Sequence, residues 1–113
     1  MEIEVEGKMV QLSEAGWLED LGEWTPAIAE KIASDIEGID ELTEEHWDII
    51  NLSREAFYED NRVSEPRKFM KLMKLKFGRD RSSNKYIFKF FPKGGLIKSA
   101  NKIGGLPRPK GCS

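Results

Sequence analysis

The sequence predicts a mainly α-helical (α+β) protein: a small helical bundle with an N-terminal β-hairpin and a flexible C-terminal arm. Residues 2–12 alternate polar and apolar side chains, as strands do, whereas residues 26–103 repeat apolar side chains at helical spacing. Residues 104–113 hold three glycines and two prolines, which favour irregular backbone. With 113 residues, 39% of them apolar, the chain suits one domain. We predict a globular part at 1–103, and an arm at 104–113 that belongs to the same domain.

The N-terminal segment predicts a short hairpin. Its strands are expected at residues 2–5 and 8–12, joined at Glu6-Gly7-Lys8. The alternation leaves open whether Met9 or Val10 faces the core. Residues 13–24 are predicted to be mostly loop, held to the core by four anchors: Trp17, Leu18, Leu21 and Trp24.

Three helices follow, and each has a recognisable start. Thr25 before Pro26 predicts a helix over 26–37 that ends at Gly38, with Ile28, Ile32 and Ile36 on one face. Thr43 before two glutamates predicts a second helix over 44–60. Ser64 is expected to cap a third helix over 65–77, which has Pro66 in its first turn and ends at Gly78. Its apolar face comprises Phe69, Met70, Met73 and Phe77.

The remaining chain predicts shorter elements. Ser82 or Ser83 begins a fourth helix that runs through Phe90 and is stopped by Pro92. Residues 96–103 are expected to form one or two further turns, and the backbone should be irregular from Gly104 onward.

Charge is divided unevenly along the chain. Residues 1–65 hold 19 of the 20 acids and four bases, a net charge of −15, whereas residues 66–113 hold 14 bases and one acid, a net charge of +13. The two parts should attract each other, and the second leaves basic surface for an acidic partner, either protein or nucleic acid. The alternative is a set of solvated faces that mainly aid solubility.

The composition excludes several kinds of site. A single cysteine cannot form an intrachain disulfide, and with His46 as the only histidine we expect no metal and no cofactor. The acidic N-terminus lacks the pattern of a signal peptide, and no apolar run is long enough to span a bilayer. We therefore expect a cytoplasmic protein without membrane association, in which the cysteine is a free thiol.

That cysteine, Cys112, is the main candidate for chemistry. Two prolines stiffen the segment that carries it and glycines give it hinges, so an extended arm starting at Gly104 would reach roughly 25–30 Å. Arg108 and Lys110 favour its thiolate, but no dedicated base lies nearby in the sequence. The thiol should therefore act through a partner rather than as a stand-alone catalyst. The simpler alternative is a surface thiol without a role.

Other candidates have structural explanations. His46, in the first turn of a helix, is expected to be structural rather than catalytic, and Met70 and Met73 to pack in the core. The helices at 44–60 and 65–77 also fit a helix-turn-helix drawing, with Arg67, Lys68, Lys71 and Lys74 toward phosphates. Because no base-reading residues are identifiable, DNA binding is not the favoured interpretation.

The arm and four earlier stretches resemble one known family. Residues 102–113 closely resemble the C-terminal arm of the DsrC/TusE family, whose pattern is Lys-Ile-Ala-Gly-Leu-Pro-Lys-Pro-x-Gly-Cys-x. Residues 16–18 lie where the family usually has Gly-Tyr-Leu, and residues 42–50, 84–86 and 91–94 match further family segments. The resemblance implies a small, mainly helical domain with a hairpin, and sulfur chemistry on the penultimate cysteine.

The resemblance also implies alternatives that differ in cysteine number. DsrC works with dissimilatory sulfite reductase and uses two arm cysteines, whereas TusE carries a persulfide toward tRNA wobble uridine, receiving it from the TusBCD complex and passing it to the thiouridylase. The second arm cysteine of DsrC lies eleven positions before the last, which is Asn101 here. The single-cysteine arm is therefore similar to that of TusE, and also to single-cysteine DsrC-like proteins of sulfur-metabolising bacteria.

We therefore predict a sulfur-relay protein in which Cys112 carries a persulfide. Its partners would be a TusBCD- or DsrEFH-like donor and a thiouridylase or sulfite reductase acceptor, with tRNA involved only indirectly. Residues expected to shape the arm or to dock it on a partner are Lys102, Gly105, Leu106, Pro107, Arg108, Pro109, Lys110 and Gly111. The alternative is a non-catalytic partner or regulatory subunit associated with sulfite reductase or sulfur oxidation.

Overall fold

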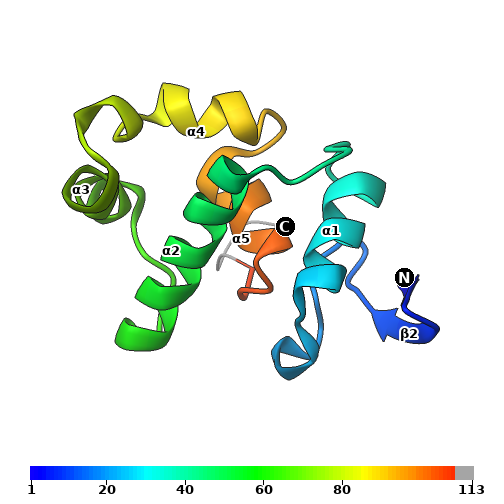
Figure 1. Ribbon diagram of the computed structural model, residues 1–113. Helices are drawn as coiled ribbons and strands as arrows, with labels where there is room; N and C mark the ends of the chain where they lie inside the picture. Colours follow the sequence, from blue (N-terminus) through cyan, green and yellow to red (C-terminus); the bar gives the residue numbers. More distant parts are fainter. Residues whose placement is uncertain (109–113) are drawn as a thin grey trace.

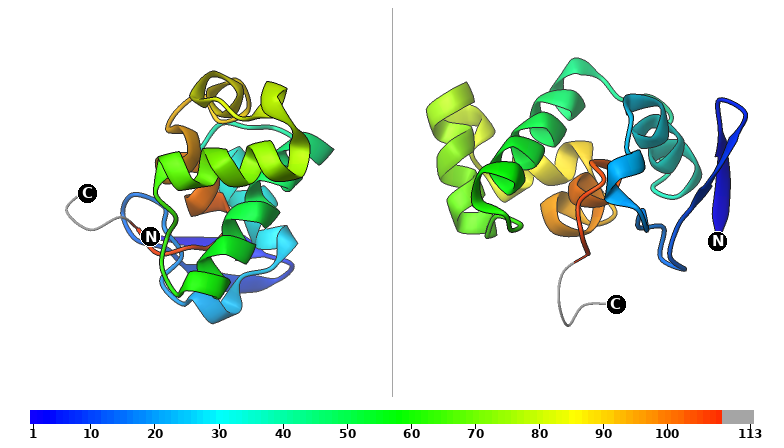
Figure 2. Two further views of the ribbon diagram at one scale, coloured as in Figure 1. Left: turned by 90° about the vertical axis from the view of Figure 1, so that its left-hand side faces the viewer. Right: turned by 90° about the horizontal axis from the view of Figure 1, so that it is seen from below.

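The computed structural model describes residues 1–108 and confirms a mainly helical bundle with an N-terminal hairpin (Figure 1). In chain order the elements are β1 (Glu2–Val5), β2 (Lys8–Gln11), η1 (Leu21–Glu23), α1 (Pro26–Asp35), α2 (Glu44–Asp60), α3 (Pro66–Phe77), η2 (Arg79–Arg81), α4 (Asn84–Phe90), η3 (Leu96–Ala100) and α5 (Asn101–Ile103). The hairpin lies at one end of the molecule and α3 at the other, with α5 between α1 and α2 (Figures 1 and 2).

The hairpin forms as predicted, with β1 and β2 paired antiparallel. Glu6 and Gly7 join the strands, and both have positive φ, 51° and 81°, as a tight two-residue hairpin turn requires. Val10 is the inward-facing residue of β2, at 1% exposure, whereas Met9 is half exposed. The chain then returns along the hairpin, where Leu12 bridges to Leu18.

The loop that follows supplies three of the four predicted anchors. Trp17 and Leu18 are buried, and Trp24 is half-buried against the core cluster. The expectation for Leu21 was wrong, because it is only partly buried at the start of η1 and lies outside the core cluster.

Helix α1 begins as predicted and ends early. The Thr25 side chain accepts a hydrogen bond from the Ile28 amide at 3.2 Å, which caps the helix. The helix stops at Asp35 because the chain opens into a wide turn, in which the Ile39 amide reaches the Ala33 carbonyl at 2.8 Å. Residues 36 and 37, predicted as helical, are instead part of this turn.

Helix α2 has the predicted bounds, and α3 starts differently from the prediction. The cap of α3 is Glu65, and the Ser64 hydroxyl is buried without a hydrogen-bond partner among the described residues. Pro66 explains the difference, because proline at the first helical position makes the residue before it the cap. Phe69 and Met73 are fully buried, as the apolar face of α3 predicted.

The last helical segment runs through the centre of the fold. Ser83 caps α4, because its side chain accepts a hydrogen bond from the Tyr86 amide. After a turn that begins at Pro92, the chain forms η3, which continues directly into α5. Ala100 and Ile103 are completely buried. Since α5 contacts both α1 and α2, the segment that leads to the arm is held on two sides.

The uneven charge contributes to this packing. Within residues 1–108, four ion pairs join a base after residue 65 to an acid before it: Asp60–Lys68, Glu55–Lys76, Asp48–Arg81 and Glu37–Lys102. The first three are on the surface and contribute little each, whereas Glu37–Lys102 is buried. No helix in residues 1–108 is long and apolar enough to cross a bilayer.

Candidate functional site

The candidate site is the arm and the structure that holds its first residues. Pro109, Lys110, Gly111 and Cys112 lie outside the described residues, so the geometry begins at the end of α5 and reaches Arg108. Gly104, Gly105 and Leu106, predicted as the start of the arm, are buried. The next described residues are half-buried Pro107 and exposed Arg108. Five residues separate Leu106 from Cys112, and the six Cα–Cα steps span at most about 20 Å.

The backbone after α5 closes in a compact turn. Gly105 has φ of +69°, which favours glycine, and its amide donates to the Lys102 carbonyl at 3.2 Å. The Leu106 amide donates to the Asn101 carbonyl at 3.0 Å. These two bonds form a Schellman motif, in which the residue after the glycine folds back on the helix. The Leu106 side chain is buried, at 1% exposure.

Two side chains from distant parts of the sequence satisfy the next two carbonyls. The Trp24 indole nitrogen donates to the Ile103 carbonyl at 2.9 Å, and the Arg54 guanidinium donates to the Gly104 carbonyl at 2.5 Å. The guanidinium carbon of Arg54 also lies 3.7 Å from the centroid of the Trp24 ring. A cation at a helix C-terminus is favoured by the helix dipole. We call residues 101–106 with Trp24 and Arg54 the arm root.

Gly105 lies so close to Trp24 that residue 105 has no room for a side chain. A Cβ on Gly105 would lie 2.3 Å from Trp24 Cδ1 and 2.6 Å from Cγ. A Cβ on Gly104, where the family pattern has alanine, would lie 3.1 Å from the Ala100 carbonyl oxygen. The backbone of the arm root therefore lies directly against the indole, which fixes where the arm leaves the domain.

Lys102 has an internal partner. Its ammonium lies 3.0 Å from the Glu37 carboxylate, and the Ser99 hydroxyl donates to the other oxygen of the same carboxylate. The side chains of Lys102 and Glu37 are 12% and 6% exposed. Lys102 was predicted to steer the arm toward a partner, but its charge is compensated inside the domain. It joins α5 to the turn after α1, and Arg108 is the exposed cation of the described arm.

Asn101, at the position of the second arm cysteine of DsrC, is also inside the arm root. Its side chain is 2% exposed, and Oδ1 has no hydrogen-bond partner among the described residues. Position 101 is therefore part of the packed helix and not of the extended arm.

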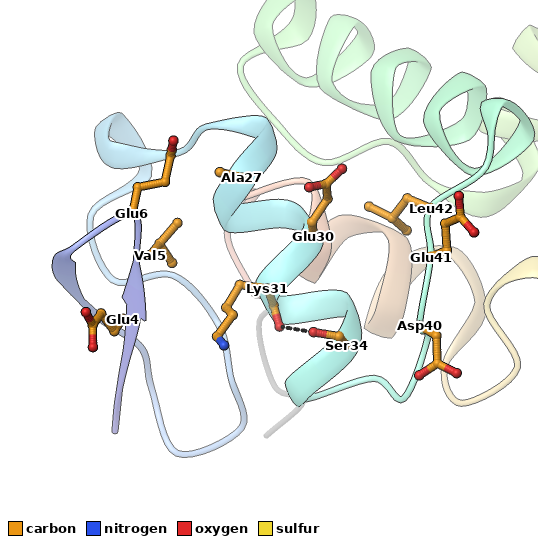
Figure 3. Close-up of a pocket in the computed structure, with 10 residues that line it drawn as sticks. All are labelled: Glu4, Val5, Glu6, Ala27, Glu30, Lys31, Ser34, Asp40, Glu41 and Leu42. Atoms are coloured by element: carbon orange, nitrogen blue, oxygen red, sulfur yellow. Dashed lines mark hydrogen bonds between the residues drawn. The ribbon is translucent and has the colours of Figure 1, made fainter.

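Two grooves on the described surface differ in their relation to the arm. Arg108 lines a groove of about 430 Å³ with Ser13, Trp17, Leu18 and Glu19. A larger groove of about 540 Å³ lies between the hairpin, α1 and residues 40–42 (Figure 3). Its rim is acidic, with five carboxylates: Glu4, Glu6, Glu30, Asp40 and Glu41. None of the predicted site residues that the structure describes lines the larger groove, whereas Arg108 lines the smaller one.

His46 is structural, as expected. The Thr43 amide donates to Nδ1 at 3.0 Å, so the proton of the neutral ring is on Nε2, which donates to the Phe90 carbonyl at 3.0 Å. The ring thereby joins the start of α2 to the end of α4. Burial lowers the pKa of His46, and the Phe90 bond and the Glu45 charge oppose this shift.

Sequence reasoning missed the role of Arg54 and the long-range role of Trp24. Arg54 is one of four bases in residues 1–65, and it follows Ile50 by four positions on the same helix face. In the sequence, only the position of the Arg54 cation beside the apolar face of its helix indicated a role for it. The pairing of Trp24 with Gly105 had no local signal.

The fold and the arm root define a small helical protein that holds the base of a short C-terminal arm rigidly and carries its only cysteine on that arm. A family model described as DsrC like protein matches residues 4–113, a range that includes Cys112. The chain belongs to this family.

Individual relatives agree with this assignment. The chain is 39% identical to Sulfurtransferase TusE of Salmonella typhimurium over 107 residues, 95% of each protein. It is 37% identical to Sulfurtransferase TusE of Pectobacterium atrosepticum over 110 residues, 97% of this chain and 98% of that one.

Solved structures with the same fold carry the DsrC name. The oxidized gamma-subunit of the dissimilatory sulfite reductase (DsrC) from Archaeoglobus fulgidus is 39% identical, with a TM-score of 0.88 over the full length of both chains. DsrC of Allochromatium vinosum is 38% identical, with a TM-score of 0.84, also over the full length of both.

Proposed function

We propose that Cys112 carries a sulfane sulfur as a persulfide, accepting it from one protein and passing it to another. The function of the chain is sulfur relay, in keeping with its family and with relatives named sulfurtransferases. The observation that carries the assignment to Cys112 is that the chain has one cysteine, within the range matched by the family model.

The transfer needs no external oxidant or reductant. The Cys112 thiolate attacks the outer sulfur of a donor persulfide, a new S–S bond forms at Sγ, and the donor sulfur leaves as a thiolate with the electron pair of the broken bond. In the second step a nucleophile of the acceptor attacks the outer sulfur, and Cys112 leaves as the thiolate. Proton and electron counts balance in both steps.

A one-cysteine carrier differs from a two-cysteine redox switch. Residue 101 is asparagine, and no second cysteine is present, so the chain cannot release sulfur by closing an internal disulfide. Release must therefore occur on a partner that supplies the attacking group. We propose a donor complex of the TusBCD or DsrEFH type and an acceptor that is a tRNA thiouridylase or sulfite reductase, in the cytoplasm.

Complementation tests the function and chooses between acceptors. We expect the chain to restore 2-thiouridine in tRNA of a Salmonella typhimurium strain without its own TusE, measured by nucleoside mass spectrometry. The Cys112→Ser variant, produced at equal level, should restore none. Equal restoration by both proteins would contradict the proposal and favour a docking subunit that moves no sulfur.

A further inference from the structure

The short span of the arm limits where a partner can bind. Leu106 is buried in the arm root, and only five residues lie between it and Cys112, so that the two are at most about 20 Å apart along extended chain. A reacting group recessed in a partner's cleft uses part of that length. The rim of the cleft must therefore contact the surface from which the arm emerges.

That surface carries a stack of three side chains. The guanidinium carbon of Arg54 lies over two aromatic rings, 3.7 Å from the centroid of Trp24 and 5.3 Å from that of Tyr58. Its donor bond to the Gly104 carbonyl places the stack at the base of the arm. Arg54 thus contacts both rings, and we call Tyr58, Arg54 and Trp24 the root stack.

Tyr58 contacts Arg54 and Phe57 but takes no part in the core of the described fold. The side chain is 54% exposed, lies outside the core cluster, and its hydroxyl makes no hydrogen bond to residues 1–108. Its ring meets that of Phe57 edge-on at 5.1 Å, which gives it a defined orientation. Tyrosine, arginine and tryptophan are the residue types that most often dominate protein interfaces.

We infer that the root stack, with Tyr58 as its exposed member, is the docking surface for the protein that takes sulfur from Cys112. This inference rests on the proposed function. The partner is a protein with a cleft that admits the arm, a nucleophilic group within about 20 Å of the rim, and an aromatic-accepting, largely apolar rim. A protein fits better than RNA because the Arg54 guanidinium already donates to the Gly104 carbonyl and contacts two aromatic rings.

The chain offers a matched control for Tyr58. Leu75 is the most exposed large apolar side chain among those described, at 84%, and lies on α3. Helix α3 lies on the opposite side of α2 from α5 and the arm root (Figures 1 and 2). Truncating Leu75 therefore removes exposed apolar surface on the side of α2 away from the arm root.

The test measures sulfur transfer as a function of carrier concentration. Wild type, Tyr58→Ala, Tyr58→Phe and Leu75→Ala are loaded with labelled sulfane sulfur and presented to the Salmonella typhimurium tRNA thiouridylase with its tRNA. We expect Tyr58→Ala to raise KM at least about tenfold with kcat within twofold, and the other two variants to stay within twofold of wild type. Loading of Cys112 by a small sulfane donor should be the same for all four proteins.

Each other outcome contradicts the inference. An unchanged KM in Tyr58→Ala, or an equal rise in Leu75→Ala, would show that the root stack is not the docking surface. If Tyr58→Ala lost only the binding of tRNA, measured without thiouridylase, the root stack would bind RNA and not a protein. Failure of wild type to load at all would remove the proposed function, whereas loading without transfer to the thiouridylase would remove only the partner class on which the inference depends.

Discussion

Replacement of Gly105 by alanine tests how firmly the arm root is built. Gly105 has φ of +69°, where a side chain costs about 1–2 kcal/mol of backbone strain. The new Cβ would lie 2.3 Å from Trp24 Cδ1, so the indole must move. Movement breaks its bond to the Ile103 carbonyl, at about 1 kcal/mol, and its stack with Arg54, at about 0.5–2 kcal/mol. We expect a total loss of about 3–5 kcal/mol.

Gly7→Ala separates the collision from the strain. Gly7 has φ of +81°, and a Cβ there would meet nothing within 4 Å, so only the strain remains. Urea unfolding of both variants, treated as two-state for a domain of this size, gives the two losses of free energy. A loss in Gly105→Ala no larger than that in Gly7→Ala would refute the close packing of residue 105 on Trp24.

Three further substitutions test the contacts around the arm root and the helix start at residue 46. Arg54→Met should lower the free energy of unfolding by about 1–3 kcal/mol, because the bond to the Gly104 carbonyl is lost. Its control, Arg67→Met at an exposed position of α3, should change that free energy by less than about 0.5 kcal/mol. Urea unfolding midpoints of the two variants measure the difference. Glu37→Gln should cost about 3–5 kcal/mol because it leaves the Lys102 charge buried without its partner, and adding Lys102→Met should recover part of that loss in a double-mutant cycle. Burial lowers the folded-state pKa of His46 below the 6.5 of the unfolded chain. The contribution of His46 to stability should therefore be complete above about pH 6.5 and fall as the pH decreases toward the folded-state pKa. Urea unfolding midpoints from pH 7.5 to 5 should show this dependence in wild type and less of it in His46→Gln.

The local elements could be predicted from the sequence because their signals are local. Thr25, Thr43 and Ser83 begin helices, and the alternation at residues 2–12 marks the hairpin. Ser64 failed as a cap because the position of Pro66 overrides the preference for serine.

The arm root could not be predicted, because its contacts join residues far apart in the chain. Trp24 bonds to a residue 79 positions away, and Glu37 to one 65 positions away. Glycines at 104 and 105 indicated a hinge by composition, but the packing of Trp24 makes this stretch a fixed support. Whether a glycine acts as a hinge depends on which side chains pack against it, and the sequence does not show that Trp24 packs against Gly105.

The central claim is that Cys112 is a persulfide carrier, and intact-protein mass spectrometry tests it most directly. The chain is incubated with a cysteine desulfurase and cysteine, then measured with and without a reductant. We predict a mass increase of one sulfur atom on wild type, located at Cys112 by peptide analysis, removed by the reductant, and absent from Cys112→Ser. An unmodified wild-type chain under conditions that load Salmonella typhimurium TusE would contradict the account.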